Sequence, residues 1–455
     1  MNCTYCNLKG EIMKETDLTQ GKIFQKLIKF SLPMIAGNLL QQIYNLVDTL
    51  IVGRCLGADA LAAVGSAYTL MIFITSIIIG LCMGSGAFFS EDYGAGNQKK
   101  LKEDIWLSFW FILSVSVVIC AIIYPGMNFI LWILQTPKEL MALTREYVIV
   151  VFVGIIFVFL YNFFAYLLRS MGNSFMPLVF LAISSVLNIV LDIWFVAGLN
   201  MGVGGAALAT VIAQAVSGLG LLIYSMIKIP VLKNNHERTG FNIQRLKKII
   251  INDVATGIQQ SVMNFGILMI QGLVNSFGTT IMASFAAAVK IDTIAYMPAQ
   301  EFGNAYSLFV SQNYGADEKD RIRKGTHISF VISALFCVVI SLMIFIFAEN
   351  LMRIFIDADE IRIIAEGTRY LKIEGSMYVG IGVLFLWYGY FRGINKPHIS
   401  LLLTVISLGT RVILSYTLAP HTPLGVTAIW SSIPIGWVLA DVVGLYLYMK
   451  IFNGR

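Results

Sequence analysis

Residues 30–53 read FSLPMIAGNLLQQIYNLVDTLIVG, and Asp48 is the one charged residue in this stretch of 24. As a helix the stretch is about 36 Å long, enough to cross a bilayer core of about 30 Å. Similar apolar stretches recur along the chain, in which 57% of residues are hydrophobic and only 13% are charged. A soluble domain carries roughly 25% charged residues. The pattern predicts an all-α polytopic membrane protein, with an acid inside its first span that needs an explanation.

The same pattern predicts twelve spans, which puts both chain ends on one side of the membrane. If that side is the cytoplasm, inner segments hold 23 of the 32 Lys and Arg residues and outer segments hold seven. This asymmetry obeys the positive-inside rule, so we expect cytoplasmic termini. The predicted spans are 28–53, 61–86, 105–125, 144–169, 175–199, 205–228, 249–276, 281–311, 326–348, 364–391, 398–419 and 425–449.

The chain also repeats itself. SEDYGA at residues 90–95 returns as SQNYGA at 311–316, an offset of 221 residues. Each half then holds six spans, and an even number makes the two repeats parallel in topology. We expect a cytoplasmic tail over 1–22, an N-terminal lobe over 23–229, a cytoplasmic linker over 230–247 and a C-terminal lobe over 248–455. Two such pseudo-symmetric lobes around a cavity are typical of a transporter that rocks between two open states, with a channel or a membrane enzyme as alternatives.

The N-terminal half gathers polar residues at one depth. Asp48 lies about 9 Å below the outer end of the first span, and Asp192 lies at nearly the same depth in the fifth. Asn188 is one turn from Asp192 on the same helix face, and Thr210 lies about 8 Å inside the sixth span. These oxygen groups suit Na⁺ or a shared proton, and we expect no other metal. The alternative is that they only make hydrogen bonds between packed helices.

The C-terminal half has no acid where the repeat would place counterparts of Asp48 and Asp192. It has its own ionisable residues near mid-depth, and two positive and two negative groups can neutralise each other in a buried ionic cluster. A second ion site is the alternative reading. The four residues are Lys290, Asp292, Glu374 and Arg411.

Several chemistries lack their motifs in this sequence. No GxxxxGK[ST] phosphate loop occurs, which argues against ATP hydrolysis by that route. No catalytic metal or nucleophile cluster is visible, so we expect no enzyme activity and no cofactor besides a coupling ion. The net charge of +6 is explained by topology rather than by nucleic-acid binding.

Long segments of the chain resemble the multidrug and toxic compound extrusion (MATE) family of prokaryotes. The resemblance extends from about Asp17 over nearly the whole chain. The segments that carry it are LPMIAGNLLQQIYNLVDTLIVGRCLGADALAAVG (32–65), the two YGA loops, LLRSMGNSFMP (167–177), LNIVLDIWFVAGLNMGVGGAALATVIAQ (187–214), MPAQEFGNAYSLFVSQNYGA (297–316) and YFRGINKP (390–397).

The resemblance implies a V-shaped, cation-coupled antiporter that exports drugs, toxins or metabolites across the cytoplasmic membrane, usually as a monomer. In the branch whose site lies in the N-terminal lobe, the functional positions are the acid of VDT, the Asn and Asp of NIVLD and the Thr of ALAT. In this sequence they are Asp48, Asn188, Asp192 and Thr210.

Other members of the family use acids of the seventh and tenth spans. Here the seventh span is expected to present Gln259 and Gln260 rather than an acid, and the tenth offers only Glu374. A lipid-linked oligosaccharide flippase of the same superfamily is an alternative, although such proteins usually have more spans and a more cationic cavity. A major-facilitator transporter would carry a GxxxDRxGRR-like loop after the second span, where this chain reads YGAGNQKKLKED.

Overall fold

The computed structural model describes residues 16–133, 137–233 and 242–453, and these residues form helices without a strand. The N-terminal half contains α1 Ile23–Leu56, α2 Ala58–Gly94, α3 Gln98–Ile133, α4 Met141–Val153, α5 Ile155–Ser170, α6 Phe175–Asp192, the π-helical η1 Ile193–Gly198, α7 Gly202–Lys228 and the short α8 Pro230–Lys233.

The C-terminal half repeats the succession of long helices after the linker, of which residues 234–241 lie outside the described part, as do residues 1–15 of the predicted tail. Its helices are α9 Ile243–Asn275, α10 Thr279–Gly315, α11 Lys319–Met352, α12 Ile361–Gly375, α13 Tyr378–Gly393, α14 Pro397–Leu418 and α15 Val426–Asn453.

Each of the twelve predicted spans corresponds to one rod, which is either a single long helix or two consecutive helices. Among the described residues, eight helices are long and apolar enough to cross a membrane, or nine when α4 and α5, which meet at a 42° bend, count as one span. The remaining rods are α1, α9 and the pair α12–α13. Polar groups inside a span usually face protein or a cavity rather than lipid, so these rods are the natural places to look for a site.

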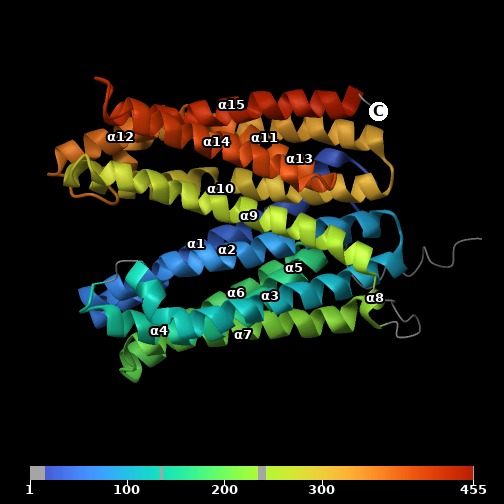
Figure 1. Ribbon diagram of the computed structural model, residues 1–455, viewed down its shortest axis with the longest axis horizontal. Helices are drawn as coiled ribbons and strands as arrows, with labels where there is room; N and C mark the ends of the chain where they lie inside the picture. Colours follow the sequence, from blue (N-terminus) through green and yellow to red (C-terminus); the bar gives the residue numbers. More distant parts are fainter. Residues whose placement is uncertain (1–15, 134–136, 234–241, 454–455) are drawn as a thin grey trace, which may run out of the picture.

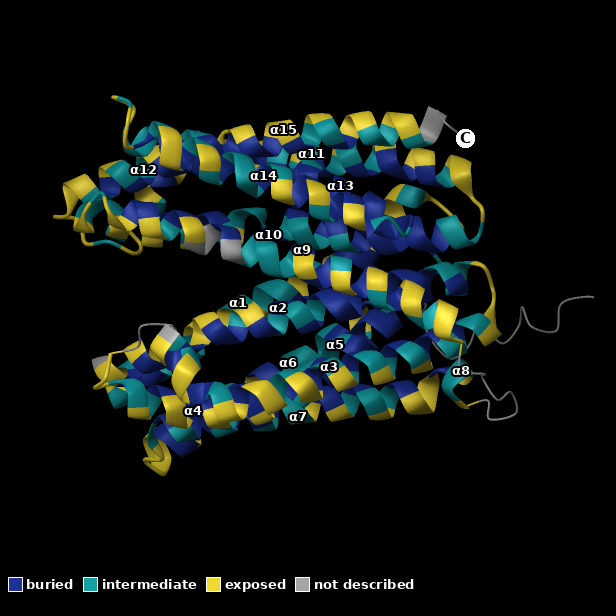
Figure 2. Cartoon of the chain, viewed as in Figure 1, coloured by how far each residue is buried: buried dark blue, intermediate teal, exposed yellow. Residues whose placement is uncertain are grey.

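The rods form two groups, each with its own hydrophobic core. Figure 1 shows α9–α15 on one side and α2–α7 on the other. The groups meet towards the end that carries α8 and the C-terminus, and they diverge towards the end that carries α4 and α12. We call the first end inner and the second outer, following the predicted topology. Exposed residues cover the outward surface of both groups, whereas buried residues line the helices where the groups meet (Figure 2).

α1 belongs to both groups. Leu27, Phe30 and Met34 in its inner half pack into the core of the C-terminal lobe. Val52 in its outer half packs into the core of the N-terminal lobe. A movement of one lobe against the other must therefore displace or bend this helix.

The two YGA loops of the repeat pack against each other at the inner end. A Cβ atom on Gly94 would lie 2.0 Å from the carbonyl oxygen of Gln312, and one on Gly315 would lie 1.9 Å from that of Glu91. Because Gln312 and Gly315 are the repeat counterparts of Glu91 and Gly94, the contact is made twice with the roles exchanged. The prediction of two pseudo-symmetric, parallel lobes is confirmed.

Candidate functional site

Asp48 of α1 and Asp192 at the end of α6 lie close enough for their carboxyl groups to interact. Asp192 is fully buried and Asp48 is half-buried. Both oxygens of Asp192 and Oδ1 of Asp48 are buried without a hydrogen-bond donor from the described residues. Two ionised carboxylates in such a place repel each other and lack solvation. The pair therefore favours binding a proton or a small cation.

The two other residues of the predicted ion site, Asn188 and Thr210, differ in their hydrogen bonding. Asn188 is 2% exposed, and neither its Nδ2 nor its Oδ1 atom has a partner among the described residues. The amide oxygen of Asn188 can therefore accept a hydrogen bond from a ligand beside Asp192, or coordinate a cation there. Thr210 instead donates its hydroxyl to the carbonyl oxygen of Ala206 at 3.1 Å, as threonines inside helices often do.

The backbone changes form directly after Asp192. The chain continues as the π-helical turn η1, whose bonds include Leu199 N–H to the Trp194 carbonyl at 2.9 Å. Such turns are rare and frequently occur at functional sites, because they loosen the regular bonding of the helix. Here the turn follows the buried acid and leads to the outer loop before α7.

Three tyrosines lie within reach of the charges of the acid pair, although no sequence motif had singled them out. The charges of Asp48 and Asp192 both act on the buried Tyr147 of α4, and that of Asp48 also acts on Tyr44 and Tyr68. Tyr44 is four residues before Asp48 and so shares its helix face, a signal that could have found it. Phenol groups can donate to a carboxylate or accept from a protonated one.

Three of the four residues of the predicted C-terminal cluster come together. Asp292, Glu374 and Arg411 line a small cavity of about 40 Å³. Asp292 accepts a hydrogen bond from Tyr378 at 2.7 Å, while Glu374 Oε2 has no partner among the described residues. Lys290 is exposed and does not line this cavity. It stands two residues from Asp292 on α10, and residues two apart on a helix do not share a face.

A set of polar contacts links α1 to helices of the C-terminal lobe about half-way along their length. Glu301 of α10 accepts a hydrogen bond from the Asn38 amide of α1 at 2.8 Å and another from Asn304 at 3.3 Å. The buried Arg392 of α13 donates to Asn304 at 2.9 Å. Asp441 has a buried oxygen without a partner among the described residues.

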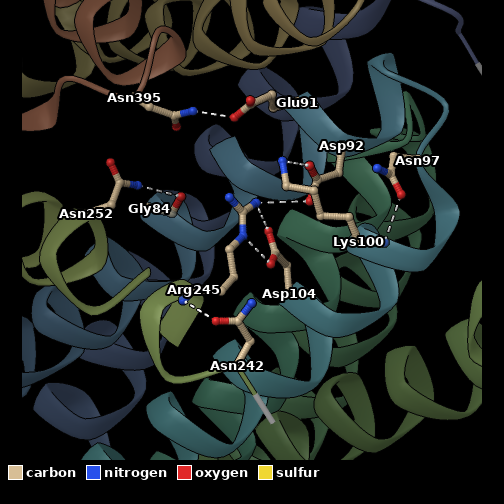
Figure 3. Close-up of polar contacts among 10 residues, drawn as sticks. All are labelled: Gly84, Glu91, Asp92, Asn97, Lys100, Asp104, Asn242, Arg245, Asn252 and Asn395. Atoms are coloured by element: carbon tan, nitrogen blue, oxygen red, sulfur yellow. Dashed lines mark hydrogen bonds and ion pairs between the residues drawn. The ribbon is translucent and has the colours of Figure 1, made fainter. Parts of the chain in front are cut away.

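Nearer the inner end, Arg245 of α9 forms an ion-pair network across the lobes (Figure 3). Its Nε donates to Asp104 of α3 at 2.7 Å, its Nη2 also contacts Asp104, and Nη2 lies 3.2 Å from Asp92 of α2. Both acids are buried, and Lys100 completes the charge balance at 2.7 Å from Asp92. In the sequence, Arg245 is only one of the basic residues of the linker.

The expectation that the seventh span carries no acid is wrong. Asp253 lies in α9, two turns beyond Arg245, and is fully buried against α2. The family resemblance pointed to the middle of the span, whereas this acid lies close to its inner end.

The chain also matches known proteins. A family model described as MatE matches it twice, over residues 33–194 and 255–417. This chain belongs to the MATE family. It is 32% identical to the "Probable multidrug resistance protein YpnP" of Bacillus subtilis (strain 168), over 87% of this chain and 88% of that protein. It is 25% identical to the "Probable multidrug resistance protein NorM" of Thermotoga maritima, over 93% of this chain and 90% of that one.

Solved structures show the same fold. One titled "Outward-facing conformation of a multidrug resistance MATE family transporter of the MOP superfamily" aligns with a TM-score of 0.91 at 23% identity, covering 97% of this chain and 99% of that chain. In this MATE protein Asp48, Asn188 and Asp192 fall inside the first matched segment, whereas Arg245 and Asp253 precede the second.

Proposed function

We propose that this MATE protein is a cation-coupled antiporter that exports drugs, toxins or amphipathic metabolites across the cytoplasmic membrane, with both termini in the cytoplasm. The observation that carries the proposal is the Asp48–Asp192 pair, in which both oxygens of Asp192 and one of Asp48 are buried without a donor among the described residues. A bound proton or Na⁺ relieves both the repulsion and the missing solvation.

The packing of α1 supports the following proposed transport cycle. An ion that enters from the outer side neutralises the two acids and lets α1 shift or bend near Pro33 and Gly37. Because α1 packs into both cores, this shift weakens the hold on the substrate and allows the lobes to rock. The ion then leaves on the inner side, and each charge moved supplies about 2.3 kcal/mol per 100 mV of membrane potential.

The outer halves of the helices suit amphipathic, often cationic compounds. Tyr68, Met269 and Met282 are 40–45% exposed there. Aromatic and methionine side chains attract cations and adapt to varied shapes without a strict hydrogen-bond pattern. We propose that the protein works as a monomer, moves its substrate without chemical change, and needs no nucleic acid or bound cofactor.

The test is transport in proteoliposomes under an imposed Na⁺ or pH gradient, with a panel of cationic dyes. Asp48→Asn and Asp192→Asn should each abolish gradient-driven efflux, because a neutral amide cannot exchange a charge. Asp59→Asn, an exposed acid of the same lobe, should leave efflux unchanged. Undiminished efflux by the Asp48→Asn and Asp192→Asn variants would remove the basis of the proposal.

A further inference from the structure

The two lobes also touch where α2 crosses α9. A Cβ atom on Gly80 would lie 2.6 Å from the Cα atom of Gly257, and one on Gly84 would lie 2.8 Å from the Cα atom of Asp253. Glycines at these α2 positions let the two backbones touch. The contact seals the inner end, and any opening towards the cytoplasm must break it.

Asp253 is enclosed in this seal with its carboxyl group only partly satisfied. Its Oδ2 accepts from the Ser85 hydroxyl at 2.5 Å, whereas Oδ1 is buried with no donor among the described residues. The neighbouring Asn252 is engaged elsewhere, because its Nδ2 donates to the Gly84 carbonyl at 3.0 Å (Figure 3).

The surrounding charges offer Asp253 no counter-ion. On α2 the nearby groups are the Cys82 thiol and Asp92, and on α3 the group is Asp104, whose negative charge acts on Asp253. On its own helix Lys247 and Lys248 are exposed, and Arg245, two turns away, is already held by Asp92 and Asp104. Glu91 at the end of α2 is hydrogen-bonded to Asn395.

An ionised carboxylate in this position is unfavourable, because it is desolvated, has one donor and is repelled by the charge of Asp104. The neutral carboxyl group avoids this cost. We propose that Asp253 is a proton-binding site of the inner seal, which takes one proton from the cytoplasm as the lobes close and returns it as they part.

This inference rests on the alternating access of the proposed function and goes beyond it. Asp253 takes its proton from the cytoplasm and returns it to the cytoplasm, so it carries no net proton across the membrane. It makes the conformational equilibrium depend on cytoplasmic pH instead. Since the closed state binds one more proton than the inner-open state, rising pH favours opening, with at most about a tenfold change in the ratio of open to closed molecules per pH unit.

Pulsed electron–electron double resonance tests the proposal. Spin labels at Gln98 and Asp320, exposed at the inner ends of the two lobes, report the inner distance in lipid nanodiscs. The labels are placed in a cysteine-free background that also carries Asp48→Asn and Asp192→Asn, so that the acid pair adds no pH response of its own. We expect the fraction of molecules with a long distance to rise with pH in the otherwise unchanged protein. Asp253→Asn, permanently neutral, should stay closed and show no pH response, whereas Asp317→Asn, an exposed acid at the same end, should respond like the unaltered chain.

Infrared spectroscopy supplies a second measurement that does not depend on opening. The closed protein should show a carbonyl-stretch band of a protonated carboxyl group that Asp253→Asn and Asp253→Ser lack. A pH response that persists in Asp253→Asn, a distance that never changes with pH, or the absence of this band each overturns the proposal. If the lobes open and close in the same way with and without Asp253, alternating access stands and only the role of Asp253 is wrong. If gradient-driven efflux fails while the pH response of the inner distance is intact, only the proposed ion coupling is wrong.

Discussion

At the scale of single residues, Arg245 balances the charge of the inner seal. It is the cation that contacts both Asp92 and Asp104, which are buried. Removing it leaves two desolvated acids with only Lys100, which contacts Asp92 alone. Such a loss is more damaging than the loss of an exposed pair, because water cannot replace the missing partner.

Arg245→Gln should therefore weaken the closed inner end by about 2–3 kcal/mol. The expected result is a larger inner-open population in the spin-label experiment and faster alkylation of a cysteine placed at Asn252. Lys99→Gln, an exposed cation in the first turn of α3, is the control. An inner end that stays as closed as in the unaltered protein would show that the network is not a latch.

At the scale of helices, the repeat matters because it places matching glycines where α2 and α10 meet. Gly94 and Gly315 each approach the backbone of the other repeat, and a backbone atom cannot move aside as a flexible side chain can. Two glycines elsewhere in these lobes, Gly65 and Gly409, are surrounded by open space, because a Cβ atom added to either would have no heavy atom outside its own helix backbone within 4 Å.

Gly94→Ala and Gly315→Ala should each destabilise the protein by about 1–3 kcal/mol through overpacking. Gly65→Ala and Gly409→Ala should be neutral or slightly stabilising, since alanine is the better helix former. Thermal unfolding in detergent compares the four variants. Equal melting temperatures for the two pairs would mean that the lobes do not close on these glycines.

At the scale of the whole molecule, transport by rocking requires α2 and α9 to separate. The Oγ atoms of Ser76 on α2 and Ser261 on α9 lie 3.5 Å apart across the lobes. The Oγ atoms of Ser415 on α14 and Ser432 on α15 lie 2.8 Å apart inside one lobe. Both pairs are close enough for a disulfide with small adjustments, but only the first would join the lobes.

In a cysteine-free background, oxidised Ser76→Cys/Ser261→Cys should lose at least nine-tenths of its efflux and regain it on reduction. Oxidised Ser415→Cys/Ser432→Cys should keep its efflux, because that bond stays within the C-terminal lobe. Efflux that survives the cross-lobe disulfide, once mass spectrometry confirms its formation, would contradict rocking.

The helical class, the twelve spans, the repeat and the acid pair could all be predicted from the sequence by itself. Those features depend on local patterns: apolar length, loop charge, a fixed offset and helix depth. Asp48 and Asp192 could be paired because a helix converts residue number into depth. Tyr147 could not be placed beside them, because nothing local says which face of the fourth span meets the first.

Only the tertiary structure decided which polar residues meet across the lobes. Asp253 and Arg245 lie near the polar start of a span, where charged residues are ordinary in sequence and are usually solvated. Asp253 is buried because Gly80 and Gly84 let α9 pack directly on α2, and Arg245 keeps 13% of its side chain exposed. Lys290 lies outside its predicted cluster because the helix places it on an exposed face. Burial between the lobes depends on residues that are far apart in the sequence. A buried charge affects the free energy of the protein much more than a solvated one.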